Sequence, residues 1–137
     1  MNPEIKAQWC ADLRSGEYKQ GRGVLHYIGI DGAQDTYCCL GVLMEQAVRA
    51  GIIKRNQSGA YYALVLDEDG ETRTENSLLM REVVEWAGLS DSNPSVMMDE
   101  AEWGKARVSL SAVNDQVEDH PIHRDFRGIA DLIEAIL

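Results

Sequence analysis

Long hydrophobic runs are missing from this sequence. The longest strongly apolar segments are residues 40–44 and 129–133, far short of the roughly 20 residues that a membrane-spanning helix needs. Residues 1–6 include an early acid and lead into no apolar segment, so they do not resemble a secretory signal. These two absences predict a protein that has no membrane partner and stays in the cytoplasm.

Cysteine and positive charge are also scarce. The three cysteines, two of them adjacent at Cys38 and Cys39, do not make the disulfide framework of a secreted domain. The 23 acidic and 13 basic residues give a formal net charge of -10, whereas a phosphate backbone attracts a basic face. We therefore expect reduced thiols and no direct binding of nucleic acid. The acidic surface either imitates the phosphate array of a duplex or only keeps the protein in solution.

Length and composition favour one small domain. With 137 residues, 45% of them hydrophobic, the chain can form one core but is too short for two comfortable domains. We predict a single domain over residues 1–137. Its class is α+β, with three or four helices packed against short antiparallel hairpins.

Segments with apolar residues three or four positions apart predict the helices. Asn2 caps the first and Asp125 the last, while Gly16, Gly51 and Gly88 mark helix ends. The predicted inward faces are Ile5, Trp9 and Leu13; Leu40, Leu43, Met44, Ala47 and Val48; Leu79, Val83, Trp86 and Ala87; and Phe126, Ile129, Ala130, Ile133 and Ile136.

Segments with strand propensity predict two hairpins. Residues 109–115 are typical of a short helical turn, and residues 96–107 have no clean period, so we expect a short helix or a loop there. The hairpins cover residues 24–28 with 36–38 and residues 61–66 with 71–74, with turns at 31–32 and 67–70.

Four blocks of sequence, in order along the chain, carry a family resemblance. They are Trp9 with residues 13–25 (LRSGEYKQGRGVL); residues 37–43 (YCCLGVL); residues 85–89 (EWAGL) with Asn93 and Pro94; and Leu110, Asn114 and Asp115 followed by Phe126 and residues 129–134 (IADLIE). With these blocks the chain resembles a widespread family of small, mostly uncharacterised bacteriophage and prophage proteins. The resemblance implies a phage accessory protein and brings no catalytic residue. The chain departs from the family pattern at residues 116–125, where a short glycine-containing turn is usual.

One segment is locally basic within the acidic chain. Its basic side chains alternate with polar ones and its glycines free backbone amides, so it can hold a phosphate or carboxylate through charge-assisted hydrogen bonds. Its spacing is not that of a P-loop. In the alternative, structural interpretation, Arg14 only ends a helix favourably, while Lys19 and Arg22 pair with nearby acids such as Asp12 and Glu17. The predicted ligand- or partner-binding residues are Arg14, Tyr18, Lys19, Gln20, Gly21, Arg22 and Gly23.

The sequence shows no complete catalytic or metal-binding set. Cys38 and Cys39 precede a predicted helix, whose N-terminus can lower a thiol pKa. No histidine has the surroundings that a cysteine hydrolase needs, and burial as small apolar residues is the alternative role of these cysteines. Residues 119–125 offer two histidines and two aspartates in no standard zinc spacing. We predict no catalytic residue, no metal and no cofactor.

Three functional hypotheses follow from these observations. The first is a small phage-encoded accessory protein that binds, and thereby inhibits, a host factor or a host antiviral defence protein. The second is a protein that sequesters an anionic nucleotide-like ligand, such as an immune signal, in residues 14–23. The third is a small enzyme that uses the thiol of Cys38 or Cys39. The sequence favours binding over catalysis.

Overall fold

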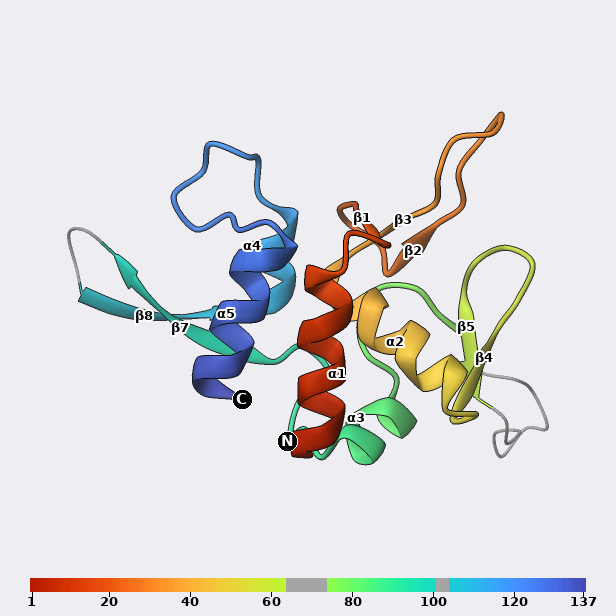
Figure 1. The fold of residues 1–137 in the computed structure, drawn as a ribbon, viewed down its shortest axis with the longest axis horizontal. Helices are drawn as coiled ribbons and strands as arrows, with labels where there is room; N and C mark the ends of the chain where they lie inside the picture. Colours follow the sequence, from red (N-terminus) through yellow and green to blue (C-terminus); the bar gives the residue numbers. More distant parts are fainter. Residues whose placement is uncertain (64–73, 101–103) are drawn as a thin grey trace.

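The computed structural model describes residues 1–63, 74–100 and 104–137. It confirms the α+β class, and the described residues contain five helices with short strands around them (Figure 1). None of these helices is long and apolar enough to cross a membrane. The helices are α1 (Pro3–Arg14), α2 (Cys39–Arg49), α3 (Arg81–Ala87), α4 (Leu110–Asp115) and α5 (Phe126–Ile136).

The strands form three small sheets in the described residues. The first has the order β1-β3-β2, with β1 parallel and β2 antiparallel to β3, and the second has the order β4-β5-β6. The third is the antiparallel pair β7-β8. The strands are β1 (Lys19–Gln20), β2 (His26–Tyr27), β3 (Thr36–Tyr37), β4 (Ile53–Arg55), β5 (Tyr61–Ala63), β6 (Thr74–Glu75), β7 (Ser95–Glu100) and β8 (Gly104–Ser109).

Helix α2 lies at the centre of the core, as its apolar pattern predicts. Every residue from Cys39 to Ala47 is buried, and the indole nitrogen of the fully buried Trp9 on α1 donates to the Cys39 carbonyl oxygen at 2.9 Å. A Cβ atom on Gly41 would lie 1.8 Å from the Leu25 carbonyl oxygen. Glycine at this position lets the first turn of α2 contact the backbone that leads into β2.

The predicted helix ends are confirmed. The Asn2 side chain accepts from the backbone amides of Glu4 and Ile5, and Asp125 caps α5 through the amide of Gly128. Gly88 follows α3 with a left-handed φ of 71°. These polar contacts satisfy amides that a helix end leaves without partners.

Three sequence expectations need correction. The described part of residues 96–107 is not a short helix or loop, because residues 96–100 in β7 pair with residues 104–108 in β8. Strand alternation is present, since Val96 and Met98 are buried while Met97 is exposed, but the adjacent methionines obscure this period of two. Ile136 is 41% exposed rather than inward-facing, and strand β4 was not expected.

The two predicted hairpins have different outcomes. The first is confirmed, with β2 paired to β3 and positive φ angles at Asp31 and Gly32 in its turn. In the second, β5 pairs with β6 as expected. Its predicted turn at residues 67–70 lies outside the described residues.

Candidate functional site

Six of the seven predicted binding residues lie in one loop, residues 15–24, that we call the basic loop, whereas Arg14 is the last residue of α1. The loop leaves the end of α1, contains the short strand β1 and leads toward β2 (Figure 1). Strand β1 joins the sheet as a parallel neighbour of β3, with Lys19 opposite Thr36. The predicted segment is therefore a shaped part of the fold, and its residues divide into an inner and an outer set.

Gln20 belongs to the inner set. Its amide nitrogen donates to the Asn114 side chain at 3.0 Å and to the Arg124 carbonyl at 3.1 Å. Asn114 is fully buried; its side-chain oxygen also accepts from the Cys39 amide, and its nitrogen donates to the Gly21 carbonyl. One buried amide thus joins the basic loop, α2 and α4.

The backbone amides of Gly21 and Gly23 in the basic loop also bond to other parts of the fold. The Gly21 amide donates to the Tyr37 carbonyl at 2.7 Å, and a Cβ atom on Gly21 would lie 2.6 Å from the Thr36 hydroxyl oxygen. The Gly23 amide donates to the Asp115 carboxylate at 3.1 Å. Only a residue without a side chain allows the approach at Gly21, which explains this part of the sequence motif.

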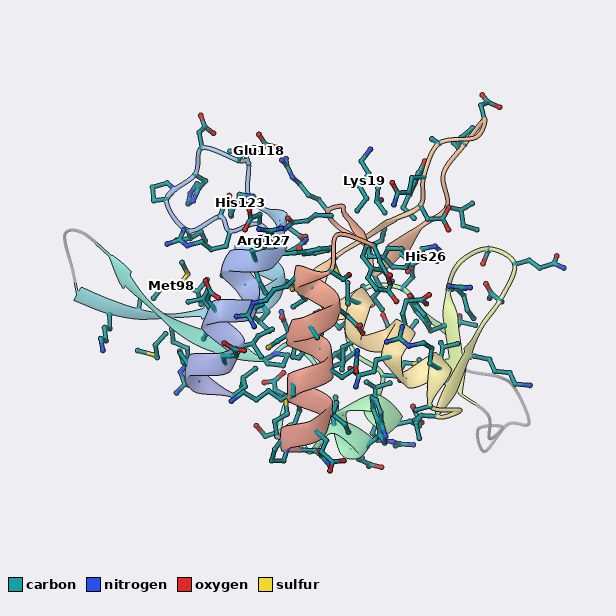
Figure 2. All side chains as sticks on the ribbon, viewed as in Figure 1. Lys19, His26, Met98, Glu118, His123 and Arg127 are labelled. Atoms are coloured by element: carbon teal, nitrogen blue, oxygen red, sulfur yellow. The ribbon has the colours of Figure 1, made fainter. Side chains whose placement is uncertain are left out.

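Lys19 and Arg22 form the outer set. Both side chains are exposed, and neither forms an ion pair with any residue that the structure describes. Figure 2 shows Lys19 on the outside of the molecule, at the end that also carries Glu118 and His123. The expected pairing with Asp12 does not occur, because the Asp12 carboxylate binds Arg49 at 2.5 Å.

Arg14 and Tyr18 have partners in the fold. The Arg14 guanidinium contacts Glu134 at 2.6 Å and Asp131 at 2.7 Å on α5, and the hydrogen bond to Glu134 is the main cause of its raised pKa. The Tyr18 hydroxyl accepts from Arg49 at 2.6 Å, and burial raises the pKa of Tyr18. Arg14 therefore joins α1 to α5 and is not available to a ligand.

The sequence did not reveal a buried histidine beside the basic loop. His26 is 3% exposed and stacks on the Tyr37 ring, with 4.6 Å between ring centroids. Its Nε2 atom lies 2.8 Å from the Asp35 carboxylate and its Nδ1 atom 3.1 Å from the Gly59 carbonyl. The ring thus connects the first sheet to the turn between β4 and β5. A single histidine in an apolar strand gives no sequence signal for such a contact.

A second polar cluster joins α2 to the β4-β5 pair. The Glu45 carboxylate is nearly buried; it binds the Arg55 guanidinium and accepts from the Tyr61 hydroxyl at 2.9 Å. Burial is the main cause of the raised pKa of Tyr61. Burial, followed by the charge of Glu45, raises the pKa of Tyr37 to about 12. Because these groups satisfy one another, the cluster stabilises the fold rather than presenting reactive groups.

The cysteines are buried rather than presented at the surface. Cys38 lies just before α2 as expected and serves as its N-cap, with its sulfur accepting from the Gly41 amide at 3.4 Å. However, burial is the dominant influence and raises the pKa of Cys38 to about 11, while burial also raises the pKa of Cys39 well above its usual value. Burial therefore outweighs the effect of the helix N-terminus on both thiols. Among the described residues, no group of three or more His, Cys, Asp or Glu side chains could hold a metal ion.

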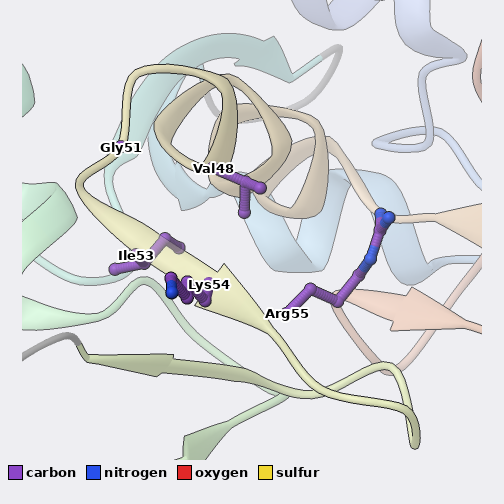
Figure 3. Close-up of a pocket in the computed structure, with 5 residues that line it drawn as sticks. All are labelled: Val48, Gly51, Ile53, Lys54 and Arg55. Atoms are coloured by element: carbon purple, nitrogen blue, oxygen red, sulfur yellow. The ribbon is translucent and has the colours of Figure 1, made fainter.

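The surface hollows near these groups are shallow. A depression of about 220 Å³ beside the basic loop is lined by Tyr18, Gln20 and Arg127, among others. A second, of about 380 Å³, lies where the end of α2 meets β4 and is lined by Val48, Gly51, Ile53, Lys54 and Arg55 (Figure 3). Arg55 is already bound to Glu45. Neither hollow has the enclosed shape that buries most of a small ligand.

Comparison with known proteins places the chain in one family. Residues 1–137 match the model of a family described as a domain of unknown function, DUF8296, so the chain belongs to this family. No curated protein and no solved structure matches the chain. The family description names no ligand or activity, so a function has to be inferred from the residues of the basic loop.

Proposed function

We propose that this DUF8296 protein is a bacteriophage accessory protein that acts by binding a host protein in the bacterial cytoplasm. The binding surface is the basic loop, and the consequence of binding is inhibition of a host factor, such as an antiviral defence protein. The phage origin rests on the sequence resemblance. The binding surface rests on the division of the basic loop into inner and outer residues.

That division is the observation that carries the proposal. Gln20, Gly21 and Gly23 form hydrogen bonds to residues far away in the sequence. These contacts fix a loop whose outward cations, Lys19 and Arg22, form no ion pair in the described part of the chain. In a chain of net charge -10, partners for two surface cations are plentiful. A loop fixed in shape with its cations free is typical of a contact surface, because preorganisation lowers the entropic cost of binding.

The form of the surface favours a protein over a nucleotide. Small-ligand sites are usually enclosed pockets of roughly 300–1,000 Å³, whereas the depression beside the basic loop is open and measures about 220 Å³. Arg14, which lines it, is neutralised by two carboxylates. Exposed cations on a braced loop instead match the carboxylates of a protein surface.

The test is affinity capture of the tagged protein from infected host cells, followed by identification of both proteins and small molecules. Three forms are compared: the unmodified chain, the double variant Lys19→Ala/Arg22→Ala, and the control Lys105→Ala/Arg107→Ala. Both variants remove two positive charges, and the control residues are exposed on β8. We expect one host protein that the unmodified chain and the control retain and the basic-loop variant loses.

Two results would overturn the proposal. Retention of a nucleotide-like molecule, lost with Lys19→Ala/Arg22→Ala, would show that the loop sequesters a small anion. Equal capture of every host protein by all three forms would show that the basic loop has no role in binding. A salt titration on the purified pair adds a second check, because contacts made by exposed charges weaken as salt screens them.

A further inference from the structure

A projecting hairpin carries an unusual concentration of exposed apolar side chains. Six large apolar residues are exposed in the described chain, and three of them lie within four positions: Tyr27 at 54%, Ile28 at 40% and Ile30 at 65%. Figure 1 shows the connection between β2 and β3 extending away from the other elements. We call residues 27–34 the hydrophobic arm. Single exposed apolar residues need no explanation, but a cluster of them often marks an interaction site.

The hydrophobic arm is held in a defined shape. At its base, the two oxygens of the Asp35 carboxylate contact the Gly29 amide at 2.9 Å and the His26 ring at 2.8 Å. A Cβ atom on Gly29 would lie 1.9 Å from the Ala33 carbonyl oxygen, so the two sides of the arm are in direct contact there. At the tip, the Ala33 amide donates to the Ile30 carbonyl at 3.1 Å. The exposed apolar residues therefore stand on a braced support.

The arm and the basic loop share one sheet. Strand β3, which follows the arm, pairs on one side with β2 and on the other with β1, which contains Lys19. The Tyr37 carbonyl at the end of β3 accepts from Gly21 of the basic loop. Lys19 in β1, Arg22 shortly after β1, and the arm between β2 and β3 thus lie on or next to one small sheet, and a single partner can contact them together.

We propose that the hydrophobic arm is the second half of the docking surface, and that the partner is a folded protein with an apolar hollow flanked by carboxylates. The arm fills the hollow, while Lys19 and Arg22 contact the acidic rim. Charge complementarity favours this partner, because Lys19 and Arg22 are exposed cations in a chain of net charge -10 and attract carboxylates to the side of the sheet next to the arm. This inference rests on the proposed function and adds the chemistry of the partner.

Photo-crosslinking in infected host cells tests the inference. A benzoyl-phenylalanine residue replaces Ile30 in one form of the full chain, Arg22 in a second and Met97, an exposed residue of β7, in a control. We expect positions 30 and 22 to crosslink to the same host protein and position 97 not to do so. The crosslinked peptide from position 30 should come from an apolar hollow, and that from position 22 from its acidic rim.

Other outcomes would overturn the inference, and they show whether the arm alone or the proposed function as a whole has failed. If position 22 crosslinks a host protein while position 30 crosslinks nothing, lipid or a second copy of this chain, the arm is not part of the surface and the basic-loop proposal stands. If neither position crosslinks a host protein, the proposed function fails as well. If the partner peptides crosslinked at both positions were purely polar and contained no acidic residue, the predicted apolar hollow with an acidic rim would be wrong.

A variant pair gives the quantitative check with the captured partner. We expect Tyr27→Ser/Ile30→Ser to raise the Kd at least about tenfold, since central apolar contacts carry much of an interface's binding energy. The matched control Met97→Ser/Ile136→Ser removes two exposed apolar residues elsewhere and should leave the Kd unchanged. Equal Kd values for the two variants would overturn the inference. Melting curves of both variants should match that of the unmodified chain, because all four side chains are exposed.

Discussion

The basic loop, residues 15–24, and the loop at residues 116–125 lie at the same end of the molecule (Figure 1), but they are held in different ways. Most hydrogen bonds of the second loop are local, such as those from the Arg124 guanidinium to the carbonyls of Pro121 and His123. The basic loop instead bonds to residues more than 90 positions away, through Gln20 and Gly23. Non-local contacts of this kind hold a loop in one shape.

The comparison also explains which sequence blocks are specific. The blocks that carry the family resemblance include Gln20, Gly21, Cys39, Asn114 and Asp115, and the structure brings all five together around the Asn114 amide. Residues 116–125, where the chain departs from the family pattern, add little to this network beyond the Arg124 carbonyl. A motif that packing alone does not explain can thus mark a buried polar network rather than a catalytic site.

The sharpest way to test the difference between the loops is to remove Asn114. The Asn114→Ala substitution leaves the Gln20 amide, the Cys39 amide and the Gly21 carbonyl without their shared partner, so we expect a loss of about 3–5 kcal/mol of unfolding free energy. In the loop at residues 116–125, Asp119 is exposed, and Asp119→Ala should change the unfolding free energy by less than about 0.5 kcal/mol. Guanidinium denaturation measures both. Similar values for the two variants would contradict the distinction between the loops.

The second prediction concerns the buried thiol of Cys38, which lies next to Cys39 in the network that holds the basic loop. A Cys38 pKa raised from 9.0 to about 11 lowers the thiolate fraction about 100-fold at neutral pH, at roughly a factor of ten per pH unit. We expect labelling of the native protein by iodoacetamide to be slower than in the guanidinium-unfolded protein by at least this factor. The native rate should rise with pH through the neutral range. Fast labelling of Cys38 at pH 6, mapped by mass spectrometry, would contradict this prediction and support the hypothesis of an enzyme that uses a cysteine thiol.

The structure also shows which parts of the fold are predictable from sequence alone. The caps at Asn2 and Asp125 and the apolar stripe of α2 are local signals, and each predicted its element well. Strand β1 is two residues long and owes its place to the distant β3, so no local pattern indicates it. The β7-β8 pair was missed because Met97 and Met98 are equally apolar while only Met98 is buried.

The candidate site was predictable in part, for a similar reason. Glycines and basic residues in one segment indicate an exposed loop, and this property is local. The partners that fix the segment, Asn114 and Asp115, come from the far end of the chain, and their own sequence gives no indication of this contact. Arg14 was assigned to the site because it lies near Lys19 in sequence, but its direction on α1 brings it to α5.

The third prediction tests the inward packing of the basic loop at one position, Gly21. In Gly21→Ala, the new methyl group would lie 2.6 Å from the Thr36 hydroxyl oxygen and 2.7 Å from its Cβ atom, so we expect a loss of about 1–3 kcal/mol from overpacking. The matched control is Gly128→Ala in α5, where the nearest atoms belong to the Arg124 side chain, at 3.1 Å and beyond, which is a looser approach than that at Gly21. Alanine favours a helix, so this control should keep or gain up to about 1 kcal/mol. Equal losses of unfolding free energy in the two variants would show that Gly21 is not packed closely against Thr36.

The smallest effect on stability should come from the outer residues of the same basic loop. Lys19→Ala/Arg22→Ala removes two exposed cations that have no ion-pair partner in the described part of the chain, so we expect unfolding free energy to change by less than about 1 kcal/mol. Binding should respond more strongly: loss of two charge-assisted contacts of about 1.5–3 kcal/mol each, reduced by solvent exposure, should lower affinity at least about tenfold. Melting curves beside a binding titration at two salt concentrations separate the two effects. A large fall in melting temperature with unchanged affinity would show that these cations serve the fold, and the distinction between inner and outer residues of the basic loop would be lost.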